Sequence, residues 1–203
     1  MDNTTQMETY KGILFKMEII ELSETLKFAG LSSEGLPDFR NIDVYCQKYR
    51  ALMAEKYPPY TEIGISTDIS NANNQNWDYI FGCQVDSIDS LPEGLIGLDT
   101  GLTKFACMTC RVQPGVGLLG EGIQMAGDYL KKEWLPKNKD RVYGYNPDNN
   151  WFYVKKSEKN YRAVNILNEG EDIAENYNFS FFIEVYKDPH TADKEMCLYV
   201  PLK

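Results

Sequence analysis

The strongest constraint on the fold is an internal repeat, because residues 27–59 resemble residues 104–136 at a constant offset of 77 positions. Self-similarity at a fixed offset is typical of a duplicated structural unit. Six positions are identical without any gap, namely Lys27, Phe28, Ala29, Pro37, Gln47 and Pro59, which match Lys104, Phe105, Ala106, Pro114, Gln124 and Pro136. The sequence therefore predicts one supersecondary unit that occurs twice.

Each copy of the unit contains a segment with helical periodicity. In the first copy apolar residues recur at intervals of three and four, at Phe39, Ile42, Cys46, Tyr49, Met53 and Tyr57. This spacing is typical of an amphipathic helix, and Pro58 and Pro59 predict where it ends. The equivalent stripe in the second copy consists of Leu119, Ile123, Leu130 and Trp134. The unit is thus predicted to be a strand, a helix and then further strands.

Strands are predicted wherever β-branched and aromatic residues alternate between turn-forming residues. Such runs occur at residues 15–22, 26–31, 62–69, 77–85, about 95–99, 102–112, 178–187 and 196–202. Residues 1–14 are expected to form a flexible lead. Residues 137–177 are rich in aromatic residues but show neither helical nor strand periodicity. We expect them to form an ordered insertion, which could serve as a lid over a pocket.

Glu184 is the only acidic residue of the run 178–187. Because side chains alternate along a strand, Phe182, Glu184 and Tyr186 share one face, and the carboxylate stands between two aromatic rings. The carboxylate lies either on a solvated sheet face or in a pocket. In a pocket, its ionised form requires a cation or a hydrogen-bond donor. The strand pattern alone leaves both alternatives open.

Charge and hydropathy exclude several classes of protein. The formal net charge is −9 over 203 residues, which argues against direct nucleic-acid binding, because phosphates are bound by clustered Lys and Arg. The sequence holds no apolar run of the length that spans a membrane, and residues 1–10 do not resemble a signal peptide. A soluble, cytoplasmic protein without membrane contact is expected, with its five cysteines as buried reduced thiols.

Three motifs are set aside. Residues 115–120 fit the letters of a dinucleotide fingerprint but lack the parallel strand and acidic residue that should follow, so no nucleotide cofactor is expected. Cys107 and Cys110 have redox-motif spacing, yet positions three apart in a strand face opposite sides. His190 is the only histidine, which excludes Ser-His-Asp and Cys-His chemistry and a His-rich metal site. No metal or other cofactor is expected.

Seven short motifs together resemble the GyrI-like small-molecule-binding domain, which forms the effector-binding half of some AraC- and MerR-type transcription regulators and also occurs alone. In chain order they are LKFAGLS (26–32), IGIS (63–66), YIFGCQV (79–85), LPEGL (91–95), EWLP (133–136), FIEVY (182–186) and LYVPL (198–202). The resemblance covers about residues 15–136 and 178–203. We expect a stand-alone form, consisting of one domain over residues 15–203.

The resemblance implies an α+β fold made of two pseudo-symmetric strand-helix-strand-strand modules. These would form a curved antiparallel sheet with two helices and a cleft between the modules. The first module would span about residues 15–90. The second would span about residues 91–203 and include the insertion at residues 137–177.

The resemblance further implies an aromatic-lined cleft whose acidic residue meets a small hydrophobic or cationic ligand. The acidic position of the family pattern falls on Glu184. Candidate aromatic ligand contacts are Tyr186, Tyr79, Phe81, Phe105, Tyr45 and Tyr49. Each of these residues could instead pack in the hydrophobic core. Tyr79, Phe81 and Tyr186 are the ones favoured as ligand contacts. Trp134 is expected to be structural.

Three functions remain open, of which binding of a cationic, lipophilic effector or drug is favoured. Residues 1–14 are not expected to form a helix-turn-helix, so regulation of transcription would require a separate DNA-binding chain. The second function is hydrolysis of strained electrophiles such as cyclopropane-bearing compounds, with Glu184 as general base. The third is a protein-interaction module of the gyrase-inhibitor type, whose acidic surface would engage a protein partner.

Overall fold

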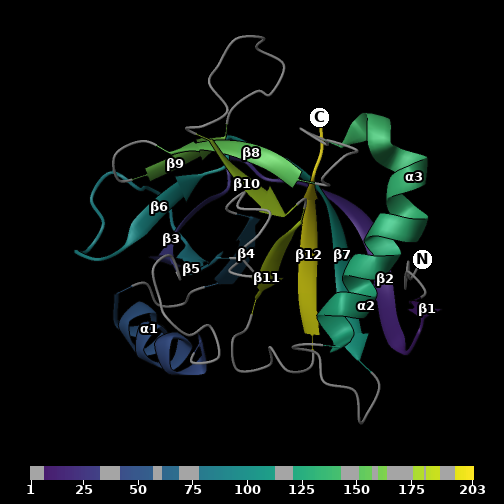
Figure 1. Ribbon diagram of the computed structural model, residues 1–203, viewed down its shortest axis with the longest axis horizontal. Helices are drawn as coiled ribbons and strands as arrows, with labels where there is room; N and C mark the ends of the chain where they lie inside the picture. The colour runs from purple at the N-terminus through teal and green to yellow at the C-terminus, as the bar shows by residue number, and fades with distance from the viewer. Residues whose placement is uncertain are drawn as a thin grey trace.

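The computed structural model describes residues 7–32, 42–56, 61–68, 78–112, 121–142, 151–156, 160–163, 176–180, 182–187 and 195–203. These residues form an α+β structure, in which helices accompany one twelve-stranded sheet (Figure 1). The pairings are antiparallel except that between β6 and β9. The predicted α+β class and antiparallel sheet are therefore confirmed.

The strands follow the predicted runs closely. They are β1 (Glu8–Tyr10), β2 (Ile13–Glu21), β3 (Lys27–Ser32), β4 (Glu62–Asp68), β5 (Asp78–Gln84), β6 (Ile96–Asp99), β7 (Lys104–Val112), β8 (Trp151–Lys156), β9 (Asn160–Ala163), β10 (Asn176–Ser180), β11 (Ile183–Tyr186) and β12 (Glu195–Pro201). Two segments differ from expectation. Residues 8–14, expected in a flexible lead, contain β1 and the start of β2, and Ile13 is fully buried. The expected insertion contains β8, β9 and the start of β10.

Two helical segments follow β3 and β7, in the order that the repeat predicts. The first is α1 (Ile42–Lys56), and the second is a continuous run of α2 (Ile123–Tyr129), the π-helical η3 (Leu130–Trp134), α3 (Leu135–Asn138) and the 3₁₀ turn η4 (Lys139–Arg141). The second run continues beyond Pro136, which is the equivalent of Pro59 in the repeat. Pro136 lies in the first turn of α3, directly after the π-helical η3.

The predicted strand at residues 178–187 is divided into β10 and β11. Both pair with the same edge of β4, but the chain advances five residues from Phe179 to Glu184 while β4 advances three, from Thr67 to Gly64. Between these two pairings the chain is therefore two residues longer than β4. The prediction of one uninterrupted strand was therefore wrong.

The sheet divides between β10 and β11. On one side β11 pairs with β12, which continues through β7 and β2 to β1. On the other side β10 pairs with β8, and the order continues through β9, β6 and β3 to β5, which pairs back onto β4. Strand β4 therefore belongs to both parts of the sheet. Because β11 lies beside β4 at the branch, it sits near the middle of the structure.

Three apolar clusters form the core. One packs α2 and Leu135 of α3 against β2, β7 and β12, and another packs Met53 of α1 against β3 and β5. The remaining cluster fills the opposite face of β7, β11 and β12, where β3 and β6 cover it with Phe28 and Leu98. Within the described ranges, none of the helices combines the length and apolarity required to cross a bilayer.

Candidate functional site

Glu184 lies on β11 and is buried, with 6% of its surface exposed. The hydroxyl of Tyr186, two residues further along the same strand, donates a hydrogen bond of 3.0 Å to its carboxylate oxygen Oε2. The alternation of side chains brings these two groups to the same face. A carboxylate and a phenol are thus held together inside the protein.

A second buried carboxylate, that of Glu62 on β4, lies directly opposite Tyr186 and is 1% exposed. Arg50 of α1 reaches this carboxylate with both ends of its guanidinium, since Nε donates to Oε2 and Nη2 to Oε1, each at 2.8 Å. The same guanidinium lies 5.5 Å from the ring centre of Phe81 on β5. Bidentate Arg–carboxylate pairs are strong and fix the geometry of both partners.

These groups lie between the two helices on one face of the sheet. Glu184 is opposite Leu198 of β12, which packs in the cluster beneath α2, and Glu62 is opposite Cys83 of β5, which packs beneath α1. In Figure 1, α1 lies at the lower left, α2 at the right and β11 between them. The polar groups therefore occupy the border between two apolar clusters.

The row of residues that crosses this border contains a glycine. Phe81, Gly64 and Glu184 lie side by side on β5, β4 and β11. Gly64 contributes no side chain, so nothing from β4 separates the ring of Phe81 from the carboxylate of Glu184 in this row. Aromatic rings attract cations, and the guanidinium of Arg50 lies over this ring.

The phenol of Tyr186 is strongly influenced by its surroundings. Burial raises its pKa well above the usual value of 10.0, and the charge of Glu184, the hydrogen bond to Glu184 and the charge of Glu62 raise it further, whereas the charge of Arg50 lowers it. Tyr186 is therefore protonated at neutral pH and remains a hydrogen-bond donor. All three charges act on this one hydroxyl.

The structure brings together three of the predicted site residues, namely Glu184, Tyr186 and Phe81. It does not bring Phe105 to them, because Phe105 lies on the opposite face of β7, fully buried, with its ring centre 5.5 Å from that of Tyr199. Phe105 is thus a core residue. The backbone places Tyr79 on β5 opposite Ser66, and Tyr45 and Tyr49 on α1, while their side chains lie outside the described parts of the chain.

Arg50 and Glu62 were not predicted from the sequence. Glu62 begins a predicted strand, where an acidic residue is usually solvated, and Arg50 lies in a helix otherwise read for its apolar stripe. The signal that identifies Glu62 is its position opposite Tyr186, more than a hundred residues away along the chain. Spacing in the sequence does not contain that pairing.

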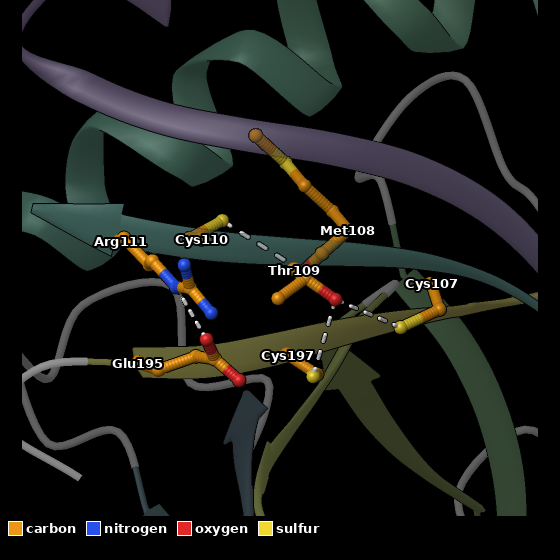
Figure 2. A network of polar contacts seen from close by, with 7 residues as sticks. All are labelled: Cys107, Met108, Thr109, Cys110, Arg111, Glu195 and Cys197. Carbon is orange, nitrogen blue, oxygen red and sulfur yellow. Dashed lines mark hydrogen bonds and ion pairs between the residues drawn. The ribbon is translucent and has the colours of Figure 1, made fainter. Parts of the chain in front are cut away.

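The cysteines behave as expected from the strand pattern. Cys107 and Cys110 face opposite sides of β7, and both are buried free thiols, as are Cys83 and Cys197. Figure 2 shows the hydroxyl of Thr109 between the thiols of Cys107 and Cys197, 3.9 Å and 3.6 Å away. Hydrogen bonds from Cys107 and Thr109 lower the pKa of Cys197 to about 7, whereas that of Cys107 is raised.

Among the described residues, no group of three or more His, Cys, Asp or Glu side chains is arranged to hold a metal ion. His190 and residues 115–120 lie outside the described ranges.

Comparison with known proteins gives distant structural similarity alone. No protein-family model and no curated protein sequence matches the chain. One similar solved structure is an integron cassette protein from the mobile metagenome of Vibrio cholerae, with a TM-score of 0.45 and 11% identity over 95% of this chain and 100% of that one. Another is an uncharacterized conserved protein from Listeria innocua, with a TM-score of 0.37 and 12% identity over 93% and 92% of the two chains. Neither similarity, at TM-scores below 0.5, indicates a family or a function.

Proposed function

We propose that this protein binds a small, lipophilic cation against Glu184, between α1 and α2. The observation that carries this proposal is the burial of the Glu184 carboxylate beside Tyr186 and in the same row as Phe81. A carboxylate removed from water favours a positively charged partner, and aromatic rings add attraction for a cation. Phe182, which is partly buried beside the cluster under α2, offers further apolar contact.

The proposal extends to the GyrI-like architecture that the motifs resemble. It comprises two pseudo-symmetric modules, over residues 15–90 and 91–203, with a ligand-binding cleft between them. In support, β3 followed by α1 and β7 followed by α2 occur at the predicted offset of 77 residues. Met53 and Leu130, which are equivalent under that offset, are both fully buried.

The test is binding of tetraphenylphosphonium, a lipophilic cation with one charge, measured by isothermal titration and by the melting temperature. A ligand at one hundred times its dissociation constant stabilises a folded protein by about 2.7 kcal/mol, so the melting temperature should rise by several degrees. Glu184→Gln should abolish both signals, and neutral triphenylphosphine oxide should bind at least tenfold more weakly.

Glu195→Gln is the matched control for this substitution. Glu195 is a partly exposed carboxylate on the neighbouring strand β12, where it pairs with Arg111 (Figure 2). Its substitution changes the net charge of the protein by the same amount as Glu184→Gln, but at a position outside the proposed site. It should bind tetraphenylphosphonium like the native protein. Equal binding by native protein and Glu184→Gln would refute the proposal.

A second candidate function is general-base hydrolysis of a strained, lipophilic electrophile. The hydrogen bond from Tyr186 to Glu184 favours it, because the raised pKa of Tyr186 keeps a proton donor next to a carboxylate that would accept a proton from the attacking water. Liquid chromatography with mass detection should then show time-dependent addition of water to a cyclopropane-bearing substrate. Glu184→Gln should stop this reaction, and a flat progress curve with the native protein would eliminate this function.

A further inference from the structure

Cys107 and Cys197 bring two thiols to one buried place between neighbouring strands. Cys107 and Thr109 are two residues apart on β7 and therefore share a face, and Cys197 of β12 lies directly opposite Thr109. The hydroxyl of Thr109 is 3.9 Å from the sulfur of Cys107 and 3.6 Å from that of Cys197 (Figure 2). Both cysteines are buried. Two sulfur atoms thus converge on one hydroxyl inside the protein.

The register of the two strands favours a bridging atom between the sulfurs over a disulfide. Cys107 is opposite Tyr199, and Cys197 precedes Tyr199 by two residues, so the cysteines are diagonal neighbours. Diagonal neighbours in an antiparallel pair lie about 7 to 8 Å apart. A disulfide usually joins Cα atoms that are only about 4.4 to 6.8 Å apart. A metal ion between the sulfurs adds two metal–sulfur bonds of about 2.3 Å each, and so suits the wider spacing.

We propose that Cys107 and Cys197 together bind one Cu(I) ion, held between their two sulfur atoms. Thiolates are the ligands that soft cations prefer, and Cu(I) is stable with two of them, whereas Zn²⁺ takes four ligands. As the two metal–sulfur bonds form, both S–H bonds break and two protons pass to solvent, while the metal keeps its oxidation state.

This site is separate from the proposed site at Glu184. Cys107 and Cys197 pack in the cluster that β3 and β6 cover. Glu184 lies opposite Leu198, which packs in the cluster beneath α2 on the other face of the sheet. Binding of Cu(I) therefore does not depend on the function proposed for Glu184.

The surroundings suit a complex of two thiolates with a singly charged cation, which has one net negative charge. The positive charge of Lys187, directly after β11, favours the ionised form of both thiols. The hydroxyl of Thr109 is placed to donate a hydrogen bond to a bound sulfur. Glu195, two residues before Cys197 on the same face, is partly exposed, so an ion has a short path from solvent.

The experiment adds Cu(I) to the reduced protein without oxygen, in competition with the chelator bathocuproine disulfonate. The native protein should retain one equivalent, and X-ray absorption should show two sulfur ligands. Cys107→Ala and Cys197→Ala should each bind Cu(I) more weakly by more than about a hundredfold. Cys110→Ala is the matched control, because Cys110 is a buried thiol on the opposite face of the same strand, and it should bind like the native protein. Native affinity in Cys107→Ala, or an equal loss in Cys110→Ala, would overturn the proposal.

Thr109→Val tests the site while both sulfur ligands remain. Valine has nearly the shape of threonine but lacks the hydroxyl, so affinity for Cu(I) should fall by about tenfold, and Thr109→Ser should restore it. A cooperative urea transition should show that both variants fold. Native affinity in folded Thr109→Val would contradict an ion held beside this hydroxyl.

Oxidation by diamide tests the spacing of the sulfurs in the folded protein. Peptide mass spectrometry should find Cys107 and Cys197 still as thiols, because their positions are too far apart for a disulfide. Rapid formation of a disulfide between them would show that the sulfurs meet directly, and would overturn the bridging geometry.

Discussion

Tyr186 of β11 lies directly opposite Glu62 of β4 while its hydroxyl donates to Glu184, so that one phenol stands between two buried carboxylates. This relationship joins the two strands that meet at the branch of the sheet. Substitution of Tyr186 should therefore change both the free energy of unfolding and its dependence on pH.

Tyr186→Phe removes the hydrogen bond to a buried carboxylate and should lower the free energy of unfolding by about 2 kcal/mol. Combined with Glu184→Gln in a double-mutant cycle, it should show a coupling energy of about 1 kcal/mol or more, because the residues are in direct contact. Urea denaturation at pH 7 measures both quantities. Additive effects of the two substitutions would contradict the hydrogen bond.

Stability should fall at alkaline pH in a way that depends on Tyr186. Its pKa is raised in the folded state, so the folded protein retains this proton more tightly than the unfolded chain, in which a tyrosine titrates near about 10. The associated stability is fully present below pH 10 and is lost as pH rises toward the folded-state pKa. The free energy of unfolding should decline less steeply above pH 10 in Tyr186→Phe. Tyr199, whose pKa burial also raises, should preserve part of the decline.

Gly82→Ala should be severely destabilising. Gly82 faces Gly30 across β5 and β3, and a Cβ atom at either position would overlap a backbone carbonyl oxygen of the opposite strand, at Ala29 or Phe81. Backbone atoms in a paired strand cannot move aside without breaking the ladder. We expect a loss of at least about 3 kcal/mol in urea denaturation.

Gly127→Ala in α2 is the control for this prediction, since its Cβ would make ordinary contact with the ring of Phe182 at 3.5 Å. Alanine is also the better helix former, so the free energy of unfolding should change by less than about 1 kcal/mol and is expected to rise. If Gly82→Ala and Gly127→Ala change the free energy of unfolding equally, the close approach of β3 and β5 does not exclude a side chain at Gly82.

The thiols of Cys83, Cys107, Cys110 and Cys197 should resist alkylation in the folded protein. Reaction requires access as well as a thiolate, and all four are buried. Iodoacetamide followed by peptide mass spectrometry should label them at least a hundredfold faster in denaturing urea. Fast labelling of Cys197 in the folded state, where its pKa is lowered to about 7, would show that its strand opens readily.

The order of elements could be predicted from the sequence because it depends on local periodicity. The strand-helix sequence at residues 27–56 and its counterpart from residue 104 follow from apolar spacing alone. The shared face of Glu184 and Tyr186 follows from the alternation of a strand. These features require no knowledge of which strands become neighbours.

Other features depend on long-range pairing, which spacing does not encode. β7 is apolar on both faces, so its sequence does not indicate whether Phe105 or Met108 faces the side of Glu184. The division of the predicted strand into β10 and β11 coincides with different partners on the far edge, β8 for one and β12 for the other. The Arg50–Glu62 pair likewise exists because α1 packs over β5 and β4.

Strand β12 has a consequence for how the protein is made. It is the only described strand that joins β7 to β11, and its residues 195–201 are synthesised after every other strand of the sheet. A ribosome builds the chain from its amino end, so β1, β2 and β7 must wait, with one edge of β7 unpaired, while most of the remaining chain is translated. A nascent chain that stalls before residue 195 would present an open strand edge to its neighbours.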